Sequence, residues 1–304
     1  MGILVKPNTL NIKITMKIKF LLYIIFVSSI SACQFQPSKR QGGNLQDADA
    51  SSTSLIKSKS YVLPKTLNEI SGITFLNNSS QVVYAIQDEA GLIYTYDLSI
   101  EAITSQFEFG QDGDYEEITN DGKYFYVLKS NGDIFSIPVA MDVDQAKVSE
   151  FKGKLGKGEY ESMGYDPENK NLVVLCKSCP TDKGNTTITG YVIHILEQGE
   201  LSLMDQFSIN LEEINQLLPK SLKSIKPSAI SRGNADHSWH LVSSVDNVLI
   251  TLDEQFKPKD LTLFNNKQFA QPEGIAFDSK DQMYISSEKG NAESGFIYQV
   301  NIRK

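Results

Sequence analysis

Five short segments of this sequence resemble one another and recur at nearly constant spacing. They read NEISGITF (68–75), DYEEITND (114–121), EYESMGYD (159–166), KPSAISRG (226–233) and QPEGIAFD (271–278). Aligned on one apolar residue each, the series is Ile73, Ile118, Met163, Ile230 and Ile275, with intervals of 45, 45, 67 and 45 residues. A regular repeat of this length predicts an architecture in which each unit is one supersecondary structure packed against its neighbours.

Each repeat has the pattern of β-strands separated by tight turns. After each motif comes a β-rich run, such as KYFYVLK or NLVVLCK, and then a second turn and a third strand. Asn-Gly and Asp-Gly pairs between alternating aromatic and β-branched residues are hairpin signals. Most repeats add a weaker fourth strand, and four strands in about 40–50 residues make the blade of a β-propeller.

The number of blades follows from the length of the repeats. Residues 58–304 are 247 residues, which is five units of 45 and the 22 extra residues of the longest interval. That interval contains LEEINQLLPKSLKSI (211–225), whose apolar residues have helical spacing. We therefore expect an all-β, five-bladed propeller of four-stranded antiparallel blades, with a short helical insertion near 211–225. A six-bladed ring with one degenerate blade is the alternative.

The two ends of the folded part are expected to meet in one blade. The last repeat ends on its third strand, at FIYQVNIRK, so KSKSYVLP (57–64) is expected to supply the missing fourth strand. Closing the ring in this way removes exposed edge strands, which otherwise promote aggregation.

The N-terminal segment has the pattern of a secretory signal. From Met16, the expected true start, two lysines precede an apolar run from Phe20 to Val27, and small residues lead to Cys33. The run is too short for a transmembrane helix, which needs roughly 20 apolar residues. Ile30-Ser31-Ala32-Cys33 resembles the lipobox of bacterial lipoproteins, whose cysteine is lipidated. We expect a signal peptide over 1–32, a flexible tether over 33–57 and the propeller over 58–304.

Lipidation at Cys33 would anchor the chain to a membrane of the cell envelope. Gln34 stands where an aspartate would retain a lipoprotein at the inner membrane, so the outer membrane facing the periplasm is expected, with surface exposure as an alternative. Residues 1–32 carry four of the 29 Lys and Arg residues and none of the 37 Asp and Glu residues, so the remainder has a net charge of −12. This charge argues against nucleic acid as a partner. We expect a monomer that binds a small ligand or an envelope protein.

The repeat brings carboxylates to one end of the propeller. Two positions before the aligned apolar residue, the five repeats have Ser71, Glu116, Glu161, Ser228 and Glu273, and each such set of aligned positions is here called a column. Equivalent positions of a five-fold ring face one another across the central channel, and isolated buried carboxylates are unfavourable without a partner. Hard oxygen ligands suit Ca²⁺, so Glu116, Glu161 and Glu273 are candidate Ca²⁺ ligands. The competing interpretation is that each glutamate only caps its own blade.

Turns after the second strands lie on the same face as the starts of the first strands, because successive strands alternate in direction. These turns add Asp88, Glu89, Lys129, Lys177 and Glu288 to the expected ligand-binding face. Glu69 at the start of a first strand and Arg232 just after the fourth motif complete it. Lys129 and Lys177 are taken as equivalent residues that neutralise the glutamates or bind an anionic group. At the next position of the repeat, one before the apolar residue, Glu117 is the one charged residue and the other repeats have small residues.

Recognisable catalytic motifs are absent from the sequence. It has no G-x-S-x-G, no H-E-x-x-H and no phosphate-binding glycine loop. The carboxylates at 112, 114 and 116 resemble the start of an EF-hand, but the sixth position is Glu117 and the twelfth is Lys123, so that interpretation fails. Cys176 and Cys179 form a C-x-x-C pair, for which a local disulfide, free thiols and a redox-active pair all remain open.

Several motifs together resemble one known family. The segments EISGITF…VVYAIQDEAGLIYTYDL, GDYEEIT…YVLKSNGDIF and QPEGIAFD…MYISSE are similar to the SdiA-regulated family of bacterial envelope-associated propellers. The resemblance covers residues 60–302 and implies a five-bladed fold, with little about chemistry. More distantly, the repeat is similar to NHL-type and phytase-like propellers, in which acidic residues near the channel hold Ca²⁺.

Three functions agree with these observations. The first is a non-enzymatic module that binds a ligand, a cation or a protein through the acidic end of the channel. The second is a Ca²⁺-dependent hydrolase of the phosphoesterase or lactonase type at the same face, by analogy of fold alone. The third is a structural role in an envelope assembly.

Overall fold

The computed structural model describes residues 54–303 except 77–78, 142–146, 183, 185, 219 and 266–267. The signal peptide, Cys33 and the tether up to residue 53 lie outside the described residues. The first strand, β1 (Ser54–Val62), begins four residues before the expected start of the propeller at 58. In the described part of the chain, no helix is both long and apolar enough to cross a membrane.

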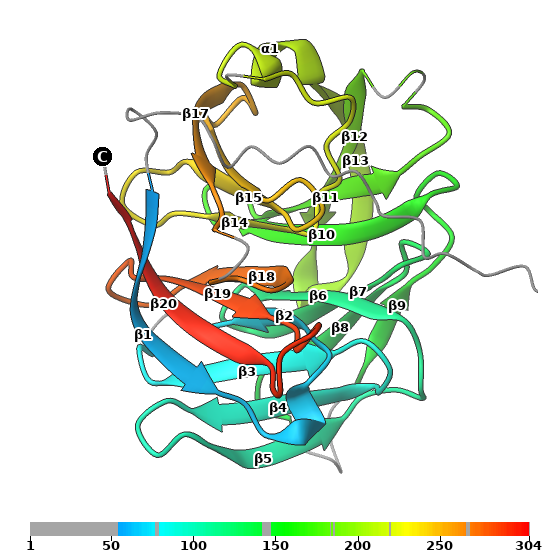
Figure 1. The fold of residues 1–304 in the computed structure, drawn as a ribbon. Coiled ribbons are helices and arrows are strands. Elements are labelled where there is room, and N and C mark those ends of the chain that lie inside the picture. The colour runs from blue at the N-terminus through cyan, green and yellow to red at the C-terminus, as the bar shows by residue number, and fades with distance from the viewer. Residues whose placement is uncertain are drawn as a thin grey trace, which may run out of the picture. The chain divides into compact units, whose positions relative to one another are not determined.

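Five blades surround a central axis, as the repeat predicts (Figure 1). The first blade contains β2 (Ile70–Thr74), β3 (Val82–Gln87), β4 (Leu92–Asp97) and β5 (Ala102–Glu108). The second contains β6 (Tyr115–Asn120), β7 (Tyr124–Lys129), β8 (Ile134–Pro138) and β9 (Ser149–Phe151). The third contains β10 (Glu159–Asp166), β11 (Asn171–Ser178), β12 (Thr187–Ile195) and β13 (Leu201–Asn210).

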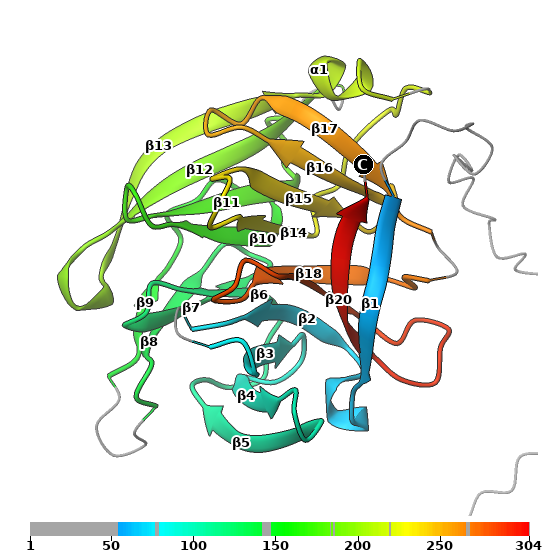
Figure 2. The same cartoon turned by 90° about the vertical axis from the view of Figure 1, so that its left-hand side faces the viewer.

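The remaining blades include both ends of the described chain. The fourth contains β14 (Ala229–Arg232), β15 (Trp239–Ser243), β16 (Val248–Leu252) and β17 (Pro258–Leu263). The fifth contains β18 (Pro272–Phe277), β19 (Met283–Ser287), β20 (Phe296–Arg303) and, as its outermost strand, β1. The expected closure is confirmed, because β1 lies antiparallel beside β20 (Figures 1 and 2).

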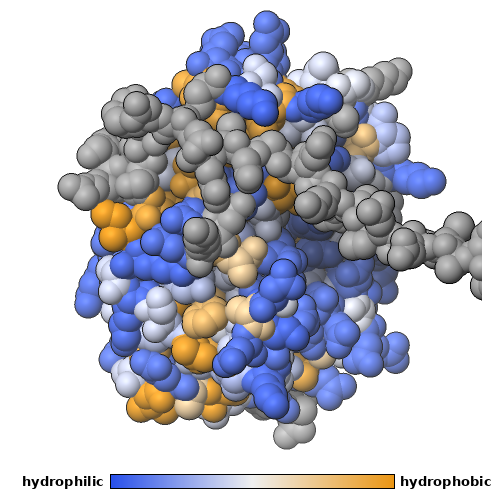
Figure 3. All heavy atoms as spheres, viewed as in Figure 1, coloured by the Kyte–Doolittle hydropathy of each residue, from blue (hydrophilic) through white to orange (hydrophobic). Residues whose placement is uncertain are grey.

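The core is distributed between the blades. Five clusters of buried apolar residues each join two neighbouring blades, as where Tyr126 of the second blade meets Met163 of the third. Each blade therefore buries both faces of its sheet, and the ring is stable only as a whole. Hydrophilic residues dominate the face shown in Figure 3, and its apolar residues form small patches.

The insertion in the long interval is less helical than its pattern predicts. Helix α1 covers only Leu211–Asn215, and Asn210 caps it by accepting a hydrogen bond from the backbone N–H of Glu212 (2.8 Å). The Asn215 side chain then bonds both backbone groups of Leu222, which turns the chain back (2.8 and 3.1 Å). Leu211 and Ile214 are buried against the cluster between the third and fourth blades, so the insertion covers that cluster.

Candidate functional site: an acidic cavity at one end of the channel

The starts of the inner strands surround a cavity of about 120 Å³, here called the acidic cavity. Ten residues line it: Ser71, Asp88, Asp114, Glu116, Glu161, Lys177, Ser228, Gln271, Glu273 and Glu288. The list contains all five residues that stand two positions before the aligned apolar residue of each repeat. It holds six carboxyl groups and one lysine, so its walls carry an excess of acidic side chains.

β-bulges place the three glutamates at the cavity. In β6, Tyr115 pairs with Lys129 and Glu117 pairs with Leu128, so Glu116 is an extra residue without a ladder partner. Glu161 in β10 and Glu273 in β18 occupy the same position in their strands. Bulges bend the strand and change the direction of the side chain at the extra residue.

One lysine partly neutralises this ring. Lys177 donates a hydrogen bond to Glu161 Oε1. Burial by itself would lower the pKa of Lys177, but the hydrogen bond and charge of Glu161 and the charge of Glu273 raise it above its ordinary value. Lys177 is therefore a fixed cation opposite several acids, and it leaves the second oxygen of Glu161 free.

A local disulfide holds Lys177 in place. Cys176 and Cys179 are bonded to each other, with their Cα atoms 5.9 Å apart. Lys226 Nζ donates a hydrogen bond to the backbone oxygen of Lys177 (3.0 Å). The C-x-x-C pair is thus a disulfide in this structure, and it brackets the one lysine of the acidic cavity.

Unpaired polar atoms point to a missing partner in the cavity. Glu161 is 6% exposed, and its Oε2 has no hydrogen-bond partner. Ser71 Oγ and Asp88 Oδ1 are likewise buried atoms without a partner, although Asp88 as a whole is only half-buried. A buried polar atom without a partner costs about 1–3 kcal/mol. A bound cation or ordered water would supply that partner.

The carboxyl groups retain protons well above their usual pH range. Burial, with the charges of Glu161 and Asp114, raises the pKa of Glu116 to about 9. Burial raises the pKa of Glu161 to about 7 against the opposing effect of Lys177, and burial together with Glu273 raises that of Glu288 to about 8. The pKa values of Glu273 and Asp88 are also raised, in both cases mainly by burial. Glu116, Glu161 and Glu288 therefore titrate near or above neutral pH.

These shifts predict that stability falls as the pH rises. In the unfolded chain the glutamates titrate near 4.5, whereas in the folded protein Glu161, Glu288 and Glu116 titrate between about 7 and 9. The folded state therefore binds more protons across this interval, and the free energy of unfolding decreases from pH 5 to pH 9. We expect a loss of several kcal/mol in EDTA, measured by urea unfolding.

The control for this prediction is Glu116→Gln. Glutamine cannot titrate, so the variant should lose less stability than the wild type over the same interval. Equal slopes for the two proteins would show that Glu116 is not protonated at neutral pH.

Four predicted residues do not line the acidic cavity. Glu69 and the exposed Glu89 lie near its rim, where their charges raise the pKa of Asp88. Lys129 lies over the ring of Tyr115, with Nζ 5.1 Å from the ring centre. Arg232 lies at the opposite end of the channel, because it stands four residues beyond Ser228 on an extended strand, roughly 13 Å along.

The error at Lys129 is one of register. Tyr115 and Tyr160 are equivalent residues of the repeat, and they pair with Lys129 and Cys176 respectively. Lys129 therefore corresponds to Cys176, and the residue that corresponds to Lys177 is Ser130. A shift of one residue on a strand turns a side chain to the other face. Ser130 instead donates a hydrogen bond to Asp114, one of two lining residues that the repeat alignment did not place in the cavity. The other is Gln271, which donates to Glu288 Oε2 (2.6 Å).

Glu117, the charged exception in a column of small residues, has a structural role. It is 1% exposed, and its Oε1 accepts a hydrogen bond from the backbone N–H of Ile118 (2.9 Å). Burial raises the pKa of the Glu117 carboxyl group well above its usual range. A Cβ atom at Gly72 would lie 2.5 Å from Glu117 Oε1. The Glu117 carboxyl group therefore fills the space that glycine leaves in the neighbouring blade.

Comparisons with known proteins agree with this architecture. The family model described as SdiA-regulated matches residues 54–292. No curated protein matches the sequence. Among solved structures, the Myxococcus xanthus glutaminyl cyclase aligns with a TM-score of 0.57 at 13% identity, covering 82% of this chain and 97% of that chain.

Two further solved structures align less well. A luciferin-regenerating enzyme has a TM-score of 0.48 at 10% identity, with 83% of this chain and 97% of that chain covered. Virginiamycin B lyase from Staphylococcus aureus has a TM-score of 0.40 at 16% identity, with 83% and 74% covered. At 13% identity, the likeness to the glutaminyl cyclase shows the fold alone.

Proposed function

The chain belongs to the SdiA-regulated family, and from that premise we propose that it is a binding module of the cell envelope whose acidic cavity takes a cation. The cation is Ca²⁺ or the positively charged group of a larger ligand. In this proposal, lipid on Cys33 anchors the module to the outer membrane. The single observation that carries the proposal is the buried, unpartnered Oε2 of Glu161 in a cavity with six carboxyl groups.

The chemistry of the cavity fits Ca²⁺, with one condition. Ca²⁺ prefers carboxylate, hydroxyl and water oxygens at about 2.3–2.6 Å. Among the His, Cys, Asp and Glu side chains of the described residues, however, only Cys176, Cys179 and Asp182 bring three potential ligand atoms within 4.8 Å of one another, and those two sulfurs are bonded to each other. The glutamates are therefore too far apart to enclose a bare ion. A cation here keeps several of its water molecules, through which the carboxylates hold it.

Binding of a cation should displace protons. Glu116 and Glu288, whose pKa values are raised to about 9 and 8, are largely protonated at neutral pH. A cation favours their charged forms, so its affinity should increase as the pH rises from 6 to 9. Proton release into unbuffered solution on addition of CaCl₂ would be a direct sign of this exchange.

Thermal unfolding with and without the ion tests the proposal. At a Ca²⁺ concentration 100 times its Kd, the folded state gains about 2.7 kcal/mol, which corresponds to a rise in Tm of roughly 5–10 °C for a domain of this size. We expect this rise at pH 8 in CaCl₂, its reversal by EDTA, and none in NaCl of equal ionic strength. An unchanged Tm together with no proton release would contradict cation binding.

Acid–base catalysis at the same cavity is the second candidate function. The observation that favours it is Glu161, whose pKa of about 7 suits a general acid or base near neutral pH and which lies beside Lys177. Assays with phosphate-ester and lactone substrates in Ca²⁺ separate the two candidates. Turnover that is lost in Glu161→Gln would establish a hydrolase, whereas a Ca²⁺-dependent Tm without turnover agrees with a binding module.

A further inference from the structure

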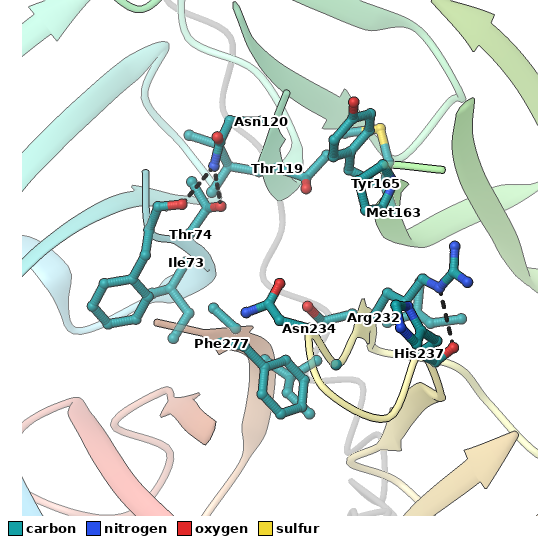
Figure 4. A pocket seen from close by; sticks show the side chains of 18 residues that line it. Ile73, Thr74, Thr119, Asn120, Met163, Tyr165, Arg232, Asn234, His237 and Phe277 are labelled. Atoms are coloured by element: carbon teal, nitrogen blue, oxygen red, sulfur yellow. Dashed lines mark hydrogen bonds between the residues drawn. The ribbon is translucent and has the colours of Figure 1, made fainter. Parts of the chain in front are cut away.

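A second cavity lies at the opposite end of the central channel. It has a volume of about 200 Å³ and is here called the distal cavity (Figure 4). Its wall includes the column two residues beyond the apolar one: Phe75, Asn120, Tyr165, Arg232 and Phe277. Its floor is the apolar column itself: Ile73, Ile118, Met163, Ile230 and Ile275. All five floor residues are nearly fully buried.

The basic side chains in the wall already have acidic partners, since His237 Nδ1 lies 3.0 Å from Glu168 Oε1 and Arg232 is neutralised as well. Arg232 is 7% exposed and donates hydrogen bonds to Asp166 and Glu168, the latter at 3.0 Å. Its Nε donates to the backbone oxygen of His237 (3.1 Å). All three guanidinium nitrogens therefore have protein partners, and no free positive charge is available for an anionic ligand.

The remaining wall combines aromatic rings with uncharged polar groups. Phe75, Tyr165 and Phe277 come from three different blades. Asn234 lies across the cavity from Thr119 (Figure 4), and its Nδ2 donates to the backbone oxygen of Asp278 (3.2 Å). Asn234 and Thr119 thus offer polar groups to a ligand in a wall that also contains aromatic rings.

The backbone adds hydrogen-bonding capacity to this wall. The inner strands β2, β6, β10, β14 and β18 each lie at the end of their strand order, so their channel-facing edges have no strand partner. Consecutive residues of β2 (Ile73, Thr74) and β6 (Ile118, Thr119) line the cavity, which places such edges in its wall. The cavity thus combines an apolar floor with a wall that is rich in polar groups, and cavities that bind small molecules use apolar contacts together with placed polar groups.

From these features we propose that the distal cavity binds an uncharged cyclic compound that carries a hydrogen-bonding substituent. Its ring would lie on the apolar floor and between the aromatic side chains, and its polar group would reach Thr119 and Asn234. The volume equals roughly six to seven water molecules, which limits the ligand to about one ring. This site is separate from the acidic cavity, since the floor of five apolar residues stands between them, and it does not depend on the proposed cation site.

Three probes of one shape and different charge test the proposal. Benzamide is neutral, benzoate is an anion and benzylammonium is a cation, while all three carry one six-membered ring. We expect benzamide to bind with a Kd in the millimolar range, with ¹⁵N–¹H shifts confined to residues of the distal cavity and to the indole of Trp239, which pairs with Arg232. Benzoate and benzylammonium should bind at least tenfold more weakly.

Two variants localise the binding. Ser231→Phe fills the cavity from β14 and should abolish the benzamide shifts, and Thr119→Phe does the same from β6 if the first variant does not fold. Glu116→Gln, at the acidic cavity, should leave the benzamide Kd unchanged. Equal or tighter binding of benzoate, or an absence of shifts at 20 mM benzamide, would overturn the proposal.

Discussion

Replacing Glu116, Glu161 and Glu273 together by glutamine is expected to abolish the Ca²⁺-dependent rise in Tm. Each side chain is an extra residue at a bulge and lines the acidic cavity, so the substitutions remove half of its carboxyl groups. Glutamine has nearly the same size but offers no negative charge, so a hydrated cation loses most of its attraction. We expect at least a hundredfold weaker Ca²⁺ binding, measured by isothermal titration calorimetry at pH 8.

The same triple variant should be more stable than the wild type without Ca²⁺. At pH 8 the wild-type protein must either retain protons on groups such as Glu116, whose pKa is about 9, or keep charges buried near one another. Neutral glutamines avoid both costs. We expect a gain on the order of 2–4 kcal/mol at pH 8 and a smaller one at pH 5.

A matched control uses exposed glutamates away from the channel. Glu108, Glu200 and Glu254 are all exposed, and none of them lines the acidic cavity. Their replacement by glutamine changes the net charge by the same amount and should leave both Ca²⁺ binding and its pH dependence unchanged. A triple channel variant that still binds Ca²⁺ like this control would show that the cavity is not the cation site.

Removal of β1 should unfold the propeller. This strand forms eight residue pairs with β20 and buries Leu55 and Tyr61 against neighbouring strands. A chain beginning at Leu63 would lose this ladder and expose β20 as an unpaired edge. The expected loss is about 5 kcal/mol or more, comparable with the whole stability of many domains.

Circular dichroism and gel filtration measure this effect. A chain beginning at Gln34, which retains β1, serves as the reference and should melt cooperatively. The chain beginning at Leu63 should lack a cooperative transition or aggregate, and a synthetic peptide of residues 54–62 should partly restore the transition. A shortened chain that melts within a few degrees of the reference would mean that closure by β1 contributes little.

Spacing alone was enough to predict the fold and the ring of glutamates. A 45-residue period fixes which residues are equivalent, and equivalent positions in a closed ring must face one axis. The convergence of Ser71, Glu116, Glu161, Ser228 and Glu273 on one cavity follows from that geometry. Closure by the segment before Leu63 followed in the same way, from counting strands in the last repeat.

Local register could not be predicted from spacing. The bulges are alike in the two blades, but Met163 pairs with a residue eleven positions later and Ile118 with one only nine positions later. The connecting turns therefore differ in length, and Ser130, not Lys129, is the counterpart of Lys177. Arg232 was placed at the wrong end because its position on β14, after Ser228 and not beside it, depends on where the strand begins. The protonation of Glu116 and Glu288 depends on burial and on charges from other blades, neither of which a repeat pattern contains.

The bulges also bear on how such a propeller can change over time. At Glu116, Glu161 and Glu273 the side chain that faces the channel belongs to the one residue of its strand that takes no part in the ladder pairing. Exchange of these residues therefore alters what the channel attracts while every strand keeps its register and every blade keeps its neighbours. Ser71 and Ser228 stand in the same column, which shows that the position accepts a short neutral side chain as readily as an acidic one. Substitutions at these five positions can therefore change which ligands the channel binds in related propellers, while the strand pairing and the packing of the blades stay the same.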